Sequence, residues 1–156
     1  MTYHTRPTAS HSHYFTVALS RPGDDLLVLE IERLRQAVRL TRVESPFQIA
    51  AWVVMPDHLH TIWTLPAGDD ASGRWRLIKA RFSASLPLHA RKLRIGNAAQ
   101  GVWQRGFWQH RITDAADMVL HMRSCQMDPV RHGLVDVPEA WPYSSFRSPA
   151  PLQQVG

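Results

Sequence analysis

The hydrophobic and polar positions along the chain predict alternating strands and helices. Residues 13–19 (HYFTVAL) are rich in aromatic and β-branched side chains, which are typical of a strand. From Gly23 to about Val43, apolar residues recur every three or four positions, which is the period of an amphipathic helix, and Pro46 ends it. Residues 47–55 (FQIAAWVVM) are nearly apolar throughout and therefore predict a central strand.

The second half of the pattern begins with a hairpin. The turn Pro56-Asp57 is so short that a strand at 58–65 must pair antiparallel with the strand before it. The next elements follow in the order helix, strand, helix, and are expected at about 74–90, within 102–112 and from 114 to about 127. Asp114 is suited to cap the last helix, and Pro129 disfavours helical geometry at the residue before it, which ends that helix at position 128.

This order of elements predicts the fold class. A β-α-β-β-α-β order with antiparallel pairing is typical of an α+β fold, the ferredoxin-like split βαβ sandwich. We expect an antiparallel sheet of four to five strands with its helices on one face. One domain should span 13–148, with the segment 141–146 (WPYSSF) packed back on it, between a flexible arm at 1–12 and a flexible tail at 149–156.

Composition adds an expected compartment. The only cysteine, Cys125, excludes an internal disulfide framework and suits a reducing cytoplasm. The first residues lack a charged start followed by an apolar run, so no signal peptide is indicated. No stretch approaches the roughly 18 consecutive apolar residues of a membrane span. We therefore expect a soluble cytoplasmic protein.

The charge distribution points to an anionic partner. The net charge is +5, yet no Asp or Glu occurs between Ala71 and Thr113, a segment that holds nine of the 18 basic residues. Such a block repels itself without an anion, and nucleic acid is the natural candidate, although a solvated basic surface would give the same pattern. Trp75, Trp103 and Trp108 lie among these arginines and could stack on unpaired bases or could be half-buried packing.

Two histidines on the third strand could hold a divalent metal ion. Residues two apart on a strand point to the same face, so His58 and His60 present their imidazoles side by side. Ser124 and Asp128 are spaced i,i+4 near the end of the last helix, and Asp128 would complete a two-histidine, one-carboxylate site if that helix packs on the strand. Alternatively, His58 and His60 bind no metal and are hydrogen-bonded histidines with a structural role only. His110 and His121 carry the same two interpretations.

Six segments, in order from His13 to about Phe146, resemble one family. They are YFTVALSRPGDDLL, AWVVMPDHLHTIWTLP, GRWRLIKARFS, VWQRGFWQHRITDAADM, DPVRHGLV and WPYSSF. Together they are similar to the REP-associated tyrosine transposases, within the IS200-like transposases and the HUH single-strand endonucleases. The resemblance implies a ferredoxin-like domain, acting as a monomer, that recognises hairpin-forming palindromes in single-stranded DNA.

The resemblance also implies a chemistry. Family members cleave and rejoin DNA, which is the basis of transposition, by attack of a tyrosine and with Mg²⁺ or Mn²⁺ at two histidines that match His58 and His60. Two positions depart from the family pattern. Asp128 replaces an asparagine, which should favour a hard cation because a carboxylate is the stronger ligand. Ser124 replaces the nucleophilic tyrosine, and its hydroxyl is a weaker acid with a shorter reach.

These observations lead to a functional hypothesis. We expect a nucleoid-associated protein that binds hairpin DNA, with DNA contacts from Arg74, Arg76, Lys79, Arg81, Arg105, Trp108, His110, Arg111 and Arg131. Strand cleavage should be impaired at Ser124. The alternatives are a catalytically silent hairpin binder, a nuclease that uses metal-activated water, and an active enzyme whose nucleophile is Ser124 or a displaced tyrosine such as Tyr3. A small-molecule metal hydrolase fits the basic segment poorly.

Overall fold

The structure of the protein is a computed structural model that describes residues 10–95 and 101–148. The described elements are β1 (His11–Ala18), α1 (Leu26–Leu29), α2 (Ile31–Glu44), β2 (Gln48–Val54), β3 (His58–Leu65), α3 (Ser72–Ser85), α4 (Leu88–Ile95), β4 (Trp108–Arg111), α5 (Ala115–Arg131) and the 3₁₀ turn η1 (Pro138–Ala140). The arm expected at 1–12 lies largely outside the described residues, as does the tail at 149–156, and β1 already begins at His11.

The four described strands form one antiparallel sheet in the order β2-β3-β1-β4. The tight hairpin places β3 beside β2, and β1 then pairs with the other edge of β3, so that the two strands joined by α2 are separated by one strand. This is the split βαβ arrangement of a ferredoxin-like fold. The predicted fold class is therefore confirmed, and β3 has the predicted bounds.

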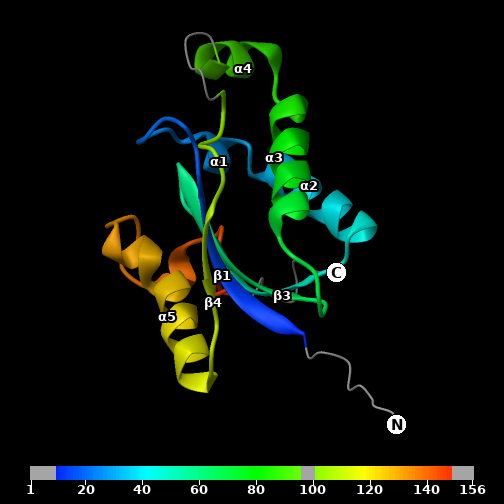
Figure 1. Ribbon diagram of the computed structural model, residues 1–156. Coiled ribbons are helices and arrows are strands. Elements are labelled where there is room, and N and C mark those ends of the chain that lie inside the picture. The colour runs from blue at the N-terminus through cyan, green and yellow to red at the C-terminus, as the bar shows by residue number, and fades with distance from the viewer. Residues whose placement is uncertain (1–9, 96–100, 149–156) are drawn as a thin grey trace, which may run out of the picture.

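Helices cover both faces of the sheet (Figure 1). On one face α2 and α3 enclose an aromatic core in which the rings of Trp63 and Trp75 stack with centroids 4.3 Å apart, beside Phe15. On the other face α5 packs over a second apolar cluster that includes Ile62 and Cys125. We expected all helices on one face of the sheet; α2 and α3 share a face, whereas α5 covers the opposite one. The central strands are apolar on both faces, and an uncovered second face would leave that surface in water.

Two predicted helices are each divided in the structure. The segment expected as one helix from Gly23 to Val43 consists of α1 and α2, separated at Glu30. The segment expected at 74–90 consists of α3 and α4, because Leu86 adopts an extended conformation before Pro87. Apolar periodicity continues across both breaks, which is why the pattern alone did not reveal them.

The prediction that the last helix ends at residue 128 is wrong. Helix α5 continues through Pro129 to Arg131, although proline cannot donate a hydrogen bond to the carbonyl one turn earlier. Pro129 is buried, and the helix closes with bonds from His132 N to Asp128 O and from Leu134 N to Pro129 O. The backbone then turns at Gly133, whose φ is +72°. The extra turn places residues 128 and 132 on one helical face.

The segment 141–146 packs back on the sheet, as predicted. Ser144 forms an antiparallel bridge with Val53 on β2, and the indole nitrogen of Trp141 donates to Val54 O at 2.9 Å. These contacts cover the edge of β2, which would otherwise expose unpaired backbone groups. None of the helices in the described part of the chain is long and apolar enough to cross a membrane.

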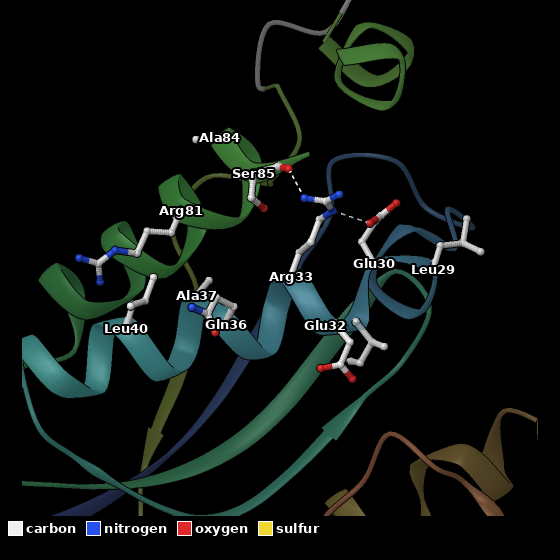
Figure 2. A pocket seen from close by; sticks show the side chains of 11 residues that line it. Leu29, Glu30, Glu32, Arg33, Gln36, Ala37, Leu40, Arg81, Ala84 and Ser85 are labelled. Carbon is white, nitrogen blue, oxygen red and sulfur yellow. Dashed lines mark hydrogen bonds and ion pairs between the residues drawn. The ribbon is translucent and has the colours of Figure 1, made fainter. Parts of the chain in front are cut away.

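An open groove lies between α2 and α3 (Figure 2). Arg33 spans it, pairing with Glu30 at 2.8 Å and donating to the carbonyl oxygen of Ser85. Leu40 and Arg81 line the groove farther along the helices. This groove is on the α2/α3 side of the sheet, whereas the histidine pair of β3 faces α5, so the groove is separate from the predicted metal site.

The aromatic core yields a test of the fold. The side chain of Trp63 is 2% exposed, so Trp63→Ala should lower the free energy of unfolding by about 3–5 kcal/mol through lost burial and a cavity. Trp108→Ala is the matched control, because Trp108 is 55% exposed and its loss should cost less than about 0.5 kcal/mol. Urea denaturation followed by circular dichroism measures both, and equal losses would contradict this assignment of the core.

Candidate metal centre and nucleic-acid interface

Strand β3 and helix α5 bring the predicted metal ligands together. His58 and His60 project from the same face of β3, and the Nε2 atoms of both imidazoles point at one carboxylate oxygen of Asp128, at 3.3 and 3.2 Å. Asp128 is only 4% exposed. The hairpin thus supplies two side chains and α5 supplies a third, 70 positions after His58, and the three are close enough to bind one metal ion.

The other nitrogen of each imidazole is held by the surrounding structure. Nδ1 of His58 lies 2.7 Å from Oδ1 of Asp57 in the hairpin turn, and Nδ1 of His60 lies 2.8 Å from the hydroxyl of Thr16 on β1. Outer hydrogen bonds of this kind fix the orientation and tautomer of metal-binding histidines, leaving Nε2 free to ligate. Asp57 and Thr16 therefore complete the site, and the pairing of Thr16 with His60 across the sheet explains the position of the threonine.

A third histidine, which the sequence prediction missed, reaches the same carboxylate. Nε2 of His132 lies 3.4 Å from Oδ1 of Asp128, and its ring centroid is 5.6 Å from that of His58. The i,i+4 spacing of residues 128 and 132 could have revealed it. That signal was hidden because Pro129 was expected to end the helix, whereas α5 continues past it.

The electrostatics of Asp128 match its surroundings. Burial by itself raises the pKa of this carboxyl, but hydrogen bonds from His58 and His60 and the nearby charge of His132 outweigh burial and hold the pKa well below its ordinary value. Burial likewise lowers the pKa of His58, whereas its bonds to Asp128 and Asp57 raise it, with a net increase. The carboxylate is therefore ionised, as a metal ligand must be.

The donor set fits a divalent cation. Nε2 of His58 and Nε2 of His60 each approach the same oxygen of Asp128. The ligand atoms of His58, Asp128 and His132 also lie within 4.8 Å of one another. Carboxylate oxygen suits Mg²⁺ and Mn²⁺, and imidazole suits transition ions, so the mixed donor set is compatible with a divalent cation.

Ser124 lies on the same face of α5, one turn before Asp128. Its hydroxyl is 3.4 Å from Nη2 of Arg131. Ser124 also lowers the pKa of the Tyr14 phenol on β1, although burial of the phenol outweighs this effect and the net pKa is raised. The ring of Tyr14 stacks on that of His60, with centroids 5.5 Å apart and planes 14° from parallel. Tyr14 was not predicted as a site residue, although its even position on β1 places it on the face that carries His60. Tyr3 is outside the described residues.

Helix α3 does not contribute its cations to this face. Arg74 is 7% exposed and bonds the carbonyl oxygens of Ser45, Pro46 and Asp70 and the carboxylate of Asp69. Lys79 donates to two backbone carbonyls, at Gln104 and Gly106, and Arg81 bonds Thr41 and Glu44. Arg74 and Arg81 thus join α3 to α2 and to the loops beside it, and Lys79 joins α3 to the segment 104–106. Their contacts with DNA stay a prediction. Sequence charge alone could not distinguish them from a free basic surface.

The remaining predicted contacts divide between the two faces of the sheet. Trp108 is exposed. Thr16 of β1 pairs with Trp108 on one side and with His60 on the other, so Trp108 and His60 lie on the same face of the sheet, two strands apart. Arg131 is exposed beside Asp128, and His110 bonds Asp117. The other three, Arg76, Arg105 and Arg111, are exposed, and Arg111 alternates to the opposite face from His110. Trp75 and Trp103 are buried packing residues.

Comparisons with known proteins assign the chain first to a class and then to a family. No family model matches the sequence. A solved structure of a Deinococcus radiodurans protein, provisionally described as a transposase, aligns with a TM-score of 0.58 over 86% of this chain and 98% of its own, at 13% identity, which shows the fold alone. Fold and site together define an α+β domain of the ferredoxin-like class with a candidate metal centre on the α5 face of its sheet.

Closer relatives identify the family. A REP-associated tyrosine transposase of Escherichia coli is 40% identical over 134 residues, covering 85% of this chain and 74% of its own. A Haemophilus influenzae protein provisionally given the same name is 36% identical over 138 residues, covering 86% and 78%. A solved REP-associated tyrosine transposase bound to a REP hairpin has a TM-score of 0.76 and 37% identity, covering 94% and 82%. The chain belongs to the family of REP-associated tyrosine transposases.

The charged groups of the site predict a pH range in which the metal-free protein is most stable. The pKa of Asp128 is depressed, so its stabilising contribution is complete above its ordinary value of 3.8 and is lost as the pH falls toward the folded value. The pKa of His58 is raised, so its contribution is complete below 6.5 and is lost as the pH rises through the folded value. Thermal unfolding with a chelator present should therefore give the highest Tm between about pH 4 and 6.5.

Asp128→Asn is the control for this pH dependence. The amide cannot ionise, so the variant should lose most of the decline in Tm on the acidic side and much of the decline above pH 6.5, because His58 loses its charged partner. A Tm profile of the wild-type chain that coincides with that of the variant would contradict the assignment.

Proposed function

We propose that this protein binds hairpin-forming single-stranded DNA of the REP type. The observation that carries the proposal is the convergence of His58, His60 and Asp128 beside Ser124, in a family of which a solved member is bound to a REP hairpin. The exposed ring of Trp108 on the same face offers a stacking surface for an unpaired base. Arg131, exposed beside the carboxylate, can contact a phosphate.

A divalent ion, Mg²⁺ or Mn²⁺, would be held by His58, His60 and Asp128, with His132 next to them. When bound, such an ion polarises the scissile phosphate and orients it for in-line attack. The contribution of the chain itself is positional. Asp57 and Thr16 hold the imidazoles in the ligating orientation, and burial of Asp128 keeps its carboxylate fixed between β3 and α5.

Strand cleavage and rejoining, the activity that the family resemblance implies, should be impaired in this chain. Ser124 lies at the right turn of α5, but its hydroxyl is far less acidic than a phenol and stops short of the position that a tyrosine would reach. Tyr14 does not substitute for it, because its side chain is 6% exposed and burial raises the pKa of its phenol. The best-supported function is therefore hairpin recognition with weak or absent cleavage.

Two further features belong to the proposal. We expect the protein to act as a monomer, which sedimentation of the chain with and without a hairpin can test. Binding to chromosomal palindromes would place it in the cytoplasm at the nucleoid, and fluorescence imaging of the tagged protein tests that location. Metal-activated water is a second route to cleavage, because an ion held by three protein side chains would also bind water.

DNA binding can be tested with one palindromic hairpin and an unstructured strand of the same composition. The wild-type chain should prefer the hairpin. Trp108→Ala should weaken binding by about 5- to 150-fold, the equivalent of one stacked base at about 1–3 kcal/mol. Val43→Ala is the control, because Val43 is 80% exposed on α2, on the other side of the sheet. Fluorescence anisotropy measures each Kd, and equal affinity for the two DNAs would overturn hairpin recognition.

Cleavage is tested separately on a denaturing gel with Mn²⁺ or Mg²⁺. The wild-type chain should give no covalent protein–DNA band, whereas Ser124→Tyr should restore one, because a phenol then lies one turn from Asp128. Adding His58→Ala to Ser124→Tyr should abolish the band. A covalent adduct formed by the wild-type chain would overturn the impairment, and cleavage without an adduct would favour the metal-activated water.

A further inference from the structure

A second group of metal-ligating side chains lies between β4 and α5. Nε2 of His110 is 2.8 Å from Oδ2 of Asp117, and Nδ1 of His121 is 3.0 Å from Oδ1 of the same carboxylate. The ligand atoms of all three residues lie within 4.8 Å of one another, and all three side chains are partly buried. None of the proposed roles at the first centre uses this group.

Local structure brings these residues together. Asp117 and His121 are one turn apart on α5, so they share a helical face. His110 lies on β4, where it pairs with Tyr14, and its ring stacks on that of His121 with centroids 4.4 Å apart. The ring of Tyr14 also contacts His121, at 4.8 Å, while its other neighbour is His60 of the first centre. The second group therefore lies across Tyr14 from the first.

The carboxylate is oriented by groups outside the cluster. Oδ2 of Asp117 accepts hydrogen bonds from the backbone N–H of Thr113 at 2.9 Å and from the Thr113 hydroxyl at 3.2 Å. Oδ1 faces His121. A carboxylate fixed in this way, with an imidazole at each oxygen, resembles in its chemistry the donor set of His58, His60 and Asp128. Outer hydrogen bonds that preset a ligand are a general feature of metal sites.

We propose that His110, Asp117 and His121 form a second divalent-cation site. Two imidazoles and one carboxylate suit a borderline ion of the Zn²⁺ or Mn²⁺ class, because Mg²⁺ and Ca²⁺ prefer oxygen ligands. Ligation requires both imidazoles to be deprotonated at the coordinating nitrogen. The ion would therefore replace the contact of His110 Nε2 with Oδ2 of Asp117 and the hydrogen bond, 2.9 Å long, from His121 Nδ1 to the backbone carbonyl of Asp117. This inference does not depend on DNA binding or on the first centre.

The position of the site indicates its role. Ser124 lies between His121 and Asp128 on one face of α5, and an ion at the second site would tie the first half of that helix to β4. The helix would then be held at two places, by the second ion near its start and by Asp128 near its end. The second ion thus acts on the position of Ser124 and not on the reacting phosphate.

Zinc stoichiometry of the metal-free full chain tests the proposal. Equilibrium dialysis with Zn²⁺ and metal analysis should give two ions per wild-type chain, one for His110→Gln/His121→Gln and one for His58→Gln/His60→Gln. His89→Gln, an exposed histidine of α4 outside both groups, is the matched control and should retain two. A failure of the first centre alone would remove only the ion that depends on His58 and His60.

Two results would overturn the second site. One is a wild-type chain whose single zinc ion is lost in His58→Gln/His60→Gln, and the other is a His110→Gln/His121→Gln variant that keeps two. If that variant does not fold by circular dichroism, ¹⁵N spectra of the histidines in the wild-type chain decide. Zinc should shift the imidazole resonances of His110 and His121, and unshifted resonances at saturation would overturn the proposal.

Discussion

The buried carboxylate of Asp128 is the contact on which the rest of the site depends. It joins strand β3 to helix α5, because imidazoles from both elements and the guanidinium of Arg131 meet its two oxygens. An ionised group at this depth is stable only when it is paired and hydrogen-bonded. The same pairing holds His58 and His60 in position, so the requirement to neutralise one buried charge also assembles the metal ligands.

The sheet supplies the two faces that this arrangement needs. Its α2/α3 face is occupied by the stack of Trp63 and Trp75 and by the ties of Arg74, and it serves stability. The α5 face carries Tyr14, His60 and Trp108, and it is the face on which the candidate metal ligands converge. Alternation along β1, β3 and β4 separates the two sets of side chains. Arg74 and Arg81 of α3 consequently stabilise the layer that is farther from the site.

Family membership predicts DNA cleavage, whereas the residues of α5 lack the tyrosine that the resemblance assigns to this chemistry. The fold and the histidine pair are those expected of a REP-associated tyrosine transposase. Asp128 replaces the asparagine of the family pattern, and Ser124 occupies the turn of α5 that the resemblance assigns to the nucleophile. Binding surface and nucleophile are separable, because base stacking and phosphate contact depend on exposed rings and cations and not on the acidity of one hydroxyl. A chain of this kind can still bind hairpin DNA when it no longer cleaves and rejoins the strand.

The sequence by itself determined the order of the elements along the chain, the hairpin and the common face of His58 and His60, because the two-residue period of strands and the short Pro56-Asp57 turn are local properties. It did not determine that α5 passes through Pro129, which brings in His132, or that Arg74 is buried. Nor did it reveal the meeting of His110 with His121. These features depend on packing between distant elements, and only the tertiary structure decides which side chains share a face.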